Sequence, residues 1–423
     1  MANFISEDDI EQALLQRLQH LAGWSTLNCF TAQPDDLNDG SGRADKREVI
    51  LADRLRAAIA RLNPQVPPAA QEQAVATLLQ PRTAMSLVKA NREVDGLVRD
   101  GVVVEYKATQ GPDAGKTVTE RVRVIDFDQP LPDAGRNEYL AVSQLWVRGE
   151  KGYRRPDVLL YVNGLPLVFV ELKNSNVKLK AAYDDNLTNY KAEIPQLFAA
   201  NALNLLSNGI ETKVGSLTAE WEHFFAWLRV DDEKEVLDRA QLAASALSLE
   251  RAVLGLLAPA RLLDYVENFV VFHRETNKVV AQNHQFIGVN NAFDVFTRRQ
   301  AVGGKLGVFW HTQGSGKSFS MIFYARKIFR KLGGHFTFVI ITDRDELDGQ
   351  IYRNFLHTAT VSKADAAQPK TSSQLRTFLG QNKRLVFTLI HKFRYDAGLA
   401  YPELSDRDDI IVMVDEAHRT QYA

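Results

Sequence analysis

The sequence predicts an α/β protein in which a mixed sheet with flanking helices is followed by a parallel sheet that carries a phosphate-binding loop. Three observations support this fold class. Apolar stretches on both sides of Asn163-Gly164 indicate paired strands buried on both faces. Strand-like and helical segments alternate after residue 262, which is typical of a parallel sheet. The segment Gly314-Ser315-Gly316-Lys317-Ser318 has the composition of a phosphate-binding loop.

Composition limits the classes of protein to consider. The chain has 423 residues with 51 basic and 52 acidic side chains, so any nucleic-acid site must be a local basic surface. One cysteine, Cys29, excludes a disulfide framework and fits a reducing compartment. No apolar run approaches the roughly 20 residues of a membrane span, and the start lacks a signal-peptide pattern. We therefore expect a cytoplasmic protein that does not associate with a membrane.

The first helix is predicted to begin after Ser6, because Ile10, Leu14 and Leu18 recur at helical spacing. Gly23 is predicted to end it. Glu11 lies beside the apolar stripe. It is either an ordinary acid in a first helical turn or an extra carboxylate beside a metal site, and the sequence leaves both interpretations open.

The rest of the first domain is predicted to extend to residue 230, and its elements follow from periodicity and from Gly- and Pro-containing turns. A helical connector is expected over 231–261, and the second domain over 262–423. The elements expected in the first domain are helices at 47–62, 69–79 and 181–200 and strands at 102–106, 122–127, 139–147 and 203–206.

Charged residues at the ends of the two apolar strands indicate a nuclease site. Cutting a phosphodiester requires a metal held by carboxylate oxygens and a cation near the reacting phosphate. Asp157 and Glu171 are the expected metal ligands and catalytic residues. Lys173 shares the face of Glu171, because side chains alternate along a strand. The alternative is that these residues are only solvated charges at strand ends.

The turn between the strands provides a geometric test. A two-residue loop at Asn163-Gly164 would place Asp157 opposite Val170, so that Glu171 would point to the other face. A three-residue loop, or a bulge that compensates for a two-residue loop, would pair Asp157 with Glu171. A shared metal site therefore requires one of these two arrangements.

The spacing Asp157-x13-Glu171-x-Lys173 resembles the core of the PD-(D/E)xK nucleases. The run from Asn163 through Lys173 is similar to that of the R (HsdR) subunits of type I restriction enzymes. Such nucleases often carry Gln-x-x-x-Tyr on the following helix as support for the site. Tyr190 matches this pattern, and Asn186 stands where the glutamine is usual.

The second constellation indicates a nucleotide site. The phosphate-binding loop is predicted to follow a strand at 306–310 and to open a helix at 319–332, so that backbone N–H groups can hold phosphates. Lys317 would contact the β- and γ-phosphates, and Ser318 would bind Mg²⁺. At the end of an apolar strand, Asp415 would hold the same Mg²⁺ and Glu416 would polarise the attacking water.

The segment Asp415-Glu416-Ala417-His418 resembles the DEAH form of helicase motif II, in which His418 would couple the nucleotide to the motor. Asn283-His284-Gln285 is similar to the segment of R subunits that reads adenine, with Gln285 on the base. These resemblances predict the first RecA-like lobe of a superfamily two motor that binds ATP.

The resemblance as a whole implies the R subunit of a type I restriction–modification enzyme, which moves double-stranded DNA with ATP and cuts it with Mg²⁺ at sites remote from the recognition sequence. Its partners would be methyltransferase and specificity subunits. The chain is expected to be an N-terminal fragment without the second motor lobe, and therefore unable to translocate. The alternative is a nucleic-acid remodelling ATPase or repair helicase whose nuclease fold is inactive and only binds DNA.

Overall fold

The chain divides into two compact units, each considered by itself. In the computed structural model, the first unit is Met1–Val270 with Thr276–His284, and the second is Val271–Glu275 with Gln285–Ala423. The domain boundaries expected from the sequence stay a prediction. The structure describes residues 5–108, 114–232, 234–236, 247–312, 314–343, 345–381, 383–393 and 403–415.

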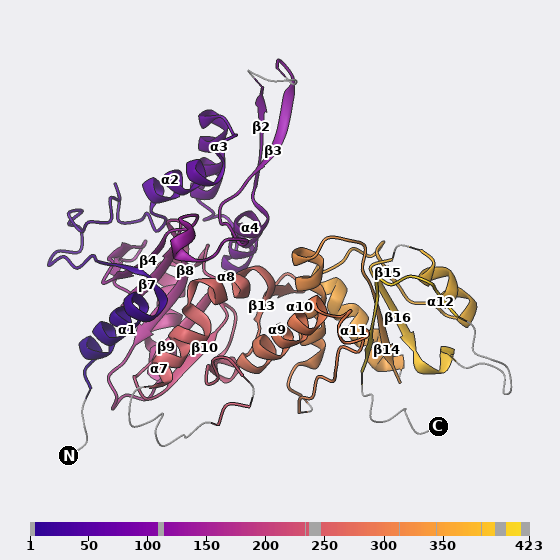
Figure 1. Ribbon diagram of the computed structural model, residues 1–423. Helices are drawn as coiled ribbons and strands as arrows, with labels where there is room; N and C mark the ends of the chain where they lie inside the picture. The colour runs from indigo at the N-terminus through magenta and orange to yellow at the C-terminus, as the bar shows by residue number, and fades with distance from the viewer. Residues whose placement is uncertain are drawn as a thin grey trace. The chain divides into compact units, whose positions relative to one another are not determined.

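A mixed sheet with the strand order β1-β4-β7-β8-β9-β10-β11 organises the first unit (Figure 1). The central strands β7 (Val158–Val162) and β8 (Leu165–Leu172) are antiparallel, and every residue in them is buried. β8 pairs in parallel with β9 (Leu203–Ser207), which confirms the mixed sheet. The other strands are β1 (Ser25–Asn28), β4 (Tyr139–Ser143), β10 (Thr212–Gly215) and β11 (Phe225–Ala226).

The connection between β7 and β8 is a two-residue turn followed by a bulge. Asn163 and Gly164 have φ values of 52° and 80°, as a primed hairpin turn requires. The register passes from Val162↔Leu165 and Tyr161↔Pro166 to Leu160↔Val168, which leaves Leu167 as the extra residue. Proline has no backbone N–H to donate to the ladder, so a position next to a bulge suits it. The compensating bulge that the metal-site hypothesis required is thereby confirmed, and the three-residue loop is absent.

The first and third helices of the first unit begin close to where periodicity places them. α1 (Glu7–Ala22) has a capping box in which the Ser6 side chain accepts from the Asp9 N–H, and Gly23 ends the helix in a left-handed conformation. The expected helix at 47–62 starts only at Ala52. The remaining helices in the N-terminal part are α2 (Ala52–Leu62), α3 (Pro68–Leu79) and α4 (Leu87–Asp100).

Two predicted strands have different bounds in the structure. β2 (Val102–Lys107) and β3 (Thr117–Val122) form an antiparallel hairpin. The strand predicted at 122–127 lies instead at 117–122, because the buried Val124 and Ile125 belong to a bend after it. The strand predicted at 139–147 ends at Ser143, and a separate small ladder joins β5 (Val147–Arg148) to β6 (Tyr153–Arg154).

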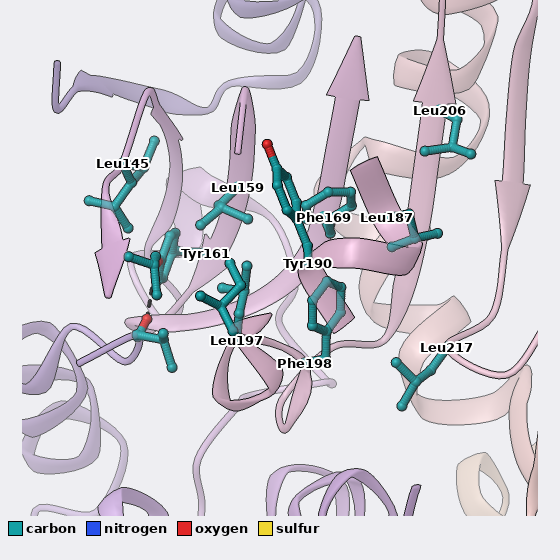
Figure 2. Packing of buried hydrophobic residues seen from close by; sticks show 14 of the residues in the cluster. Leu145, Leu159, Tyr161, Phe169, Leu187, Tyr190, Leu197, Phe198, Leu206 and Leu217 are labelled. Atoms are coloured by element: carbon teal, nitrogen blue, oxygen red, sulfur yellow. Dashed lines mark hydrogen bonds between the residues drawn. The ribbon is translucent and has the colours of Figure 1, made fainter. Parts of the chain in front are cut away.

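The main core of the first unit lies on the face of the sheet that carries Phe169. Phe169 meets Tyr190 edge-on at 5.7 Å between ring centroids, and Phe198 at 5.4 Å. Figure 2 shows these rings together, with the hydroxyl of Tyr190 directed out of the apolar cluster. The helix expected over 181–200 is divided into a π-helical turn, a short helix and a 3₁₀ turn. These are η2 (Ala182–Leu187), α5 (Thr188–Glu193) and η3 (Pro195–Phe198).

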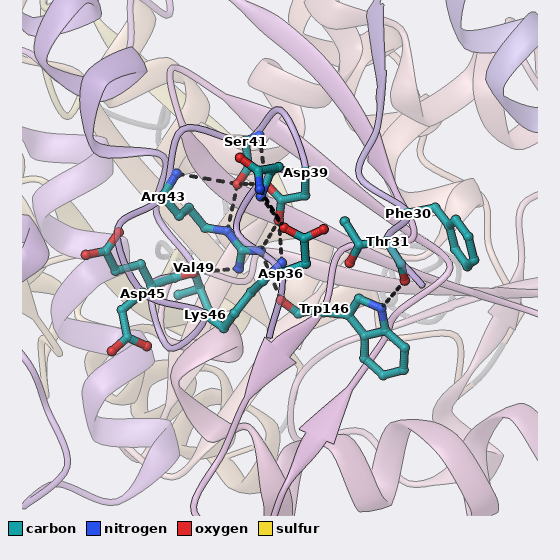
Figure 3. Close-up of polar contacts among 12 residues, drawn as sticks. Phe30, Thr31, Asp36, Asp39, Ser41, Arg43, Asp45, Lys46, Val49 and Trp146 are labelled. Atoms are coloured by element: carbon teal, nitrogen blue, oxygen red, sulfur yellow. Dashed lines mark hydrogen bonds and ion pairs between the residues drawn. The ribbon is translucent and has the colours of Figure 1, made fainter. Parts of the chain in front are cut away.

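A buried polar network fastens the loop between β1 and α2 (Figure 3). The Asp39 carboxylate accepts from Arg43 and Lys46 at 2.8 Å each, and the side chains of all three are almost fully buried. Burial would raise the pKa of Asp39, but bonds from Lys46, Ser41 and Arg43 hold it well below its usual range. Arg43 also donates to the Trp146 carbonyl at 3.0 Å, so the loop is tied to the sheet.

The second unit contains a parallel sheet in the order β15-β16-β14-β17, which confirms the predicted parallel layout. The strand expected at 306–310 is wrong, because residues 305–312 have no regular structure and Val308 and Trp310 are 87% and 82% exposed. The strands are β14 (Thr337–Thr342), β15 (Ala366–Ala367), β16 (Leu385–Leu389) and β17 (Ile410–Val414). The helices include α9 (Asn283–Thr297), α10 (Lys317–Lys331), α11 (Asp345–His357) and α12 (Ser372–Leu379).

The chain between the two sheets is also largely helical where it is described. Its elements are α7 (Leu247–Ala252), η5 (Val253–Leu257), α8 (Pro259–Asn268), β12 (Val270–His273) and β13 (Asn277–Val280). Within the described ranges, no helix has both the length and the apolar character that crossing a membrane requires.

Candidate functional site

The register of the central hairpin brings Asp157 and Glu171 to the same face of the sheet. Val158 pairs with Val170, so the next pair outward is Asp157 with Glu171. The Asp157 side chain accepts a hydrogen bond of 2.7 Å from the Leu172 N–H, and its backbone carbonyl accepts one of 2.9 Å from the Gln144 N–H. Two carboxylates are therefore fixed side by side at one end of the strands.

Glu171 is the most deeply buried acid of this group, with 2% of its surface exposed. One carboxylate oxygen accepts from the Lys173 ammonium at 3.2 Å. The other oxygen is buried and has no hydrogen-bond partner among the described residues. Burial, followed by the charge of Asp157, raises the pKa of Glu171 well above its ordinary value. A buried carboxylate oxygen without a donor is costly unless a cation approaches it.

Lys173 extends the group on the same face as Glu171. Besides its contact with Glu171, the ammonium donates to the Leu172 carbonyl at 2.9 Å. The side chain is 15% exposed, so the charge lies at the edge of the buried acids. This arrangement places a cation where a phosphate could approach.

Glu11 joins the acids from α1, which packs against β8. Its side chain is buried and accepts from the Gln144 amide at 2.5 Å. Burial and the charge of Asp157 raise the pKa of Glu11 to about 7, against the opposing hydrogen bond from Gln144. Glu11 therefore lies near Asp157, and its part in a metal site stays a prediction.

Burial makes the charged forms of these carboxylates unfavourable. Burial raises the pKa of Asp157 to about 6, although the Leu172 N–H and the Lys173 charge oppose the rise. Three neighbouring acids with raised pKa values and one unpartnered oxygen fit a divalent cation. Within the described parts of the chain, no three or more His, Cys, Asp or Glu side chains form a ready cage for a metal. Mg²⁺ commonly uses one or two carboxylates and keeps several waters, so such a cage is unnecessary.

Tyr190 and Asn186 lie at the side of this group. The Tyr190 hydroxyl donates to the Arg155 carbonyl at 3.3 Å, and burial followed by the charge of Glu171 raises its pKa. Asn186 is half-buried within the π-helical turn and lies near the Tyr190 hydroxyl, whose pKa it lowers against the effect of burial. The structure therefore brings Tyr190 close to Glu171, with Asn186 beside Tyr190.

Sequence reasoning missed two residues of the group. Gln144 bonds both Glu11 and the Asp157 backbone from a left-handed conformation with φ 57°. Nothing in the sequence marks that conformation. Glu7 accepts from the Asn174 N–H at 3.3 Å, and its charge acts on both Asp157 and Glu171. The sequence feature that could have identified Glu7 is its position in the first turn of the helix that bears Glu11.

The phosphate-binding loop of the second unit leads into α10. Gly314 and Gly316 have φ values of 81° and 82°, and Lys317 is the first residue of the helix. The Ser315 N–H donates to the Thr312 carbonyl at 3.3 Å. The Lys317 ammonium donates to the His311 carbonyl at 3.2 Å, so it folds back over the loop where phosphates would lie.

The other predicted nucleotide residues are only partly described. Ser318 is half-buried in the first turn of α10. Gln285 is buried and donates to the Gly316 carbonyl at 3.0 Å, so it contacts the loop itself. Asp415 follows β17, and its N–H donates to the Ile341 carbonyl at 2.9 Å. Glu416 and His418 lie outside the described residues.

The geometry defines a class of protein: an α/β chain with two neighbouring carboxylates and a lysine in one unit and a Gly-Ser-Gly-Lys-Ser loop that opens a helix in the other. A family model described as the type I restriction enzyme R protein N terminus matches residues 4–223, and one described as an SWI2/SNF2 ATPase matches residues 284–423. The first covers more than half of the chain. The chain belongs to the type I restriction enzyme R protein family.

Individual relatives agree with this assignment. The chain is 39% identical to the type I restriction enzyme HindI endonuclease subunit of Haemophilus influenzae, over 99% of this chain and 39% of that protein. It is 31% identical to a putative type I restriction enzyme MjaIXP endonuclease subunit of Methanocaldococcus jannaschii, over 98% of this chain and 40% of that protein. The chain thus spans about two fifths of the length of these curated relatives.

Proposed function

We propose that this chain is part of the R subunit of a type I restriction–modification enzyme, an ATP-driven translocase that cuts unmodified double-stranded DNA at non-fixed sites remote from the recognition sequence. The observation that carries the nuclease half is the strand register, which sets Asp157 opposite Glu171 one residue beyond the Val158↔Val170 pair. The second carboxylate oxygen of Glu171 is buried without a donor among the described residues. Membership of the R protein family and a relative named as an endonuclease subunit support the same function.

In this proposal, Asp157 and Glu171 hold Mg²⁺, with Glu11 close enough to adjust the charge of the site. The metal would supply Lewis-acid stabilisation of the phosphate and a more acidic bound water. Lys173 would stabilise the negative charge that develops on the phosphate. Its contact with Glu171 keeps the ammonium on the reacting face. Tyr190 and Asn186 would support the site from the neighbouring helix.

The second unit would supply energy by binding and hydrolysing ATP. Phosphates would be held by the loop N–H groups of Gly314, Ser315 and Gly316 and by the N-terminus of α10. The Lys317 ammonium lies over this loop. Ser318 and Asp415 would hold a second Mg²⁺. The role proposed for Gln285 is contact with the adenine. The match to an ATPase family over residues 284–423 supports this half of the proposal.

Glu416 and His418 are proposed to act as the water-polarising acid and as the link between nucleotide and motor. The proposed partners of the whole protein are double-stranded DNA and the methyltransferase and specificity subunits. The proposal includes a cytoplasmic location, where such a DNA substrate is found.

The test is Mg²⁺-dependent nicking of supercoiled plasmid DNA by the purified chain, alone and with its methyltransferase and specificity partners. Asp157→Ala and Lys173→Ala are expected to abolish nicking while DNA binding persists. Lys178→Ala is the matched control, since Lys178 is exposed on the segment after the site. Nicking that survives in both site variants would overturn the nuclease assignment. DNA binding and ATP hydrolysis without any metal-dependent nicking would favour an inactive nuclease fold that only binds DNA.

A further inference from the structure

An arginine beside the acids lies against two aromatic rings. The Arg155 guanidinium carbon is 5.2 Å from the ring centroid of Phe30 and 4.9 Å from that of Trp146. Both separations are within cation–π range. Phe30 is 57% exposed, so this pairing of charge and rings faces the surface.

The two rings are held by the loop between β1 and α2. The Trp146 indole N–H donates to the Thr31 carbonyl at 3.1 Å, which ties the ring to the residue after Phe30. Arg43 of the buried network donates to the Trp146 carbonyl (Figure 3). The aromatic support is therefore built on residues that are themselves fixed by buried bonds.

The hydrogen-bond donors of Arg155 are not used within the described part of the protein. Neither an ion pair nor a side-chain hydrogen bond of Arg155 is present among those residues. Stacking on aromatic rings occupies the faces of a guanidinium and leaves the N–H groups at its edge available. The adjacent Arg154 differs, because it is paired with Glu193.

Arg155 is also close to the reacting face. It is separated from Asp157 only by the buried Pro156, and its positive charge opposes the rise in the pKa values of Asp157 and Glu11. Its backbone carbonyl accepts from the Tyr190 hydroxyl. A guanidinium with free edge donors next to a phosphodiester-cutting site matches the bidentate geometry of a phosphate.

We propose that Arg155, held against Phe30 and Trp146, binds a backbone phosphate of the DNA strand next to the phosphate that is cut. This assignment rests on the proposed nuclease function, and it adds a positioning contact to that site. Binding a neighbouring phosphate would fix the register of the strand over the acids. The alternative role for Arg155 is to neutralise the charge of the neighbouring carboxylates. That role would not require unused N–H donors at the edge of the guanidinium.

The test measures binding of a short fluorescein-labelled DNA duplex to the full chain by anisotropy, in Ca²⁺ and at several salt concentrations. Arg155→Gln is expected to weaken binding about tenfold and to reduce the slope of log affinity against log salt by about one, as expected when one phosphate contact is lost. Arg154→Gln is the matched control and should change neither quantity. Arg155→Lys should keep the slope while binding more weakly than the natural chain.

An unchanged salt slope in Arg155→Gln would overturn the phosphate contact. If Arg155→Gln fails to fold, the Arg155→Lys variant provides the test instead. A Lys variant whose DNA affinity and salt slope both equal those of the natural chain would exclude a bidentate contact. Phe30→Ala should weaken binding about threefold with the slope unchanged, since the charge remains. Binding in Ca²⁺ requires no cleavage. A natural chain that binds through Arg155 but never nicks DNA in Mg²⁺ would therefore overturn the nuclease proposal and leave the phosphate contact standing.

Discussion

Replacing Asp157 by asparagine should stabilise the metal-free first unit at neutral pH. The pKa of Asp157 rises from 3.8 to about 6 on folding, mainly through burial. Below the unfolded pKa the carboxyl is protonated in both states, so the substitution changes little. As pH rises toward 6, the unfolded chain releases a proton that the folded chain retains, and stability falls.

The size of this effect follows from the shift in pKa. A difference of about two pK units corresponds to roughly 3 kcal/mol, and partial exposure reduces the expected value to about 1–3 kcal/mol. Asparagine removes the charge and still accepts a hydrogen bond from the Leu172 N–H. The Asn variant should therefore unfold at higher urea concentration at about pH 8 and show no difference at about pH 3.5.

Tryptophan fluorescence measures this transition in the first unit. Of the five tryptophans, only Trp310 belongs to the second unit, so a Trp310→Phe background restricts the signal to the first. Mg²⁺ should stabilise the parent chain and leave the Asn variant unchanged. An Asn variant that is less stable at every pH, or a difference that does not depend on pH, would refute the reasoning.

The remaining predictions concern the turn, the loop network and the nucleotide site. Gly164→Ala should destabilise the first unit by about 3 kcal/mol or more in urea unfolding, because φ is 80° and the new Cβ would lie 2.5 Å from a backbone oxygen. Gly135→Ala also has a positive φ but open space around the new Cβ, and should cost about 1 kcal/mol. Equal costs would contradict this account. Asp39→Asn should cost about 3–5 kcal/mol in the same assay, because Arg43 and Lys46 would remain buried without a carboxylate partner. The control Asp35→Asn changes an exposed residue and should cost nearly nothing. A mild effect of Asp39→Asn would rule out the network as an anchor of the loop. Lys317→Ala should abolish binding of a fluorescent ATP analogue without lowering the stability of the first unit, and retained binding would exclude this loop as the phosphate site.

The central hairpin was predictable from sequence because its signals are local. Continuous apolar residues on both sides of Asn163-Gly164 indicated buried strands, and the requirement that Asp157 face Glu171 anticipated a bulge. The position of the bulge was harder to predict from the sequence, because it depends on how Pro166 and Leu167 pack against β7 and β9. Leu167, for example, gives its carbonyl to the Ala202 N–H at 2.6 Å.

Other elements depended on packing that sequence patterns do not contain. α4 was missed although Ala90, Val94 and Val98 are buried at helical spacing. The apolar segment at 306–310 resembles a strand in composition, yet no described strand pairs with it. Gln144 and Glu7 belong to the site only through tertiary contacts. Gln144 reaches the acids from a left-handed backbone position, and Glu7 accepts a hydrogen bond from the Asn174 N–H.

The central claim is that Asp157 and Glu171 together hold a divalent metal. The most direct measurement is calorimetric titration of Mn²⁺ into the nucleotide-free chain and into its Glu171→Gln variant, in the Lys317→Ala background and at about pH 8. The account predicts a metal site with proton release in the parent and its loss in the variant. Equal Mn²⁺ binding by the two proteins, or none by either, would contradict it.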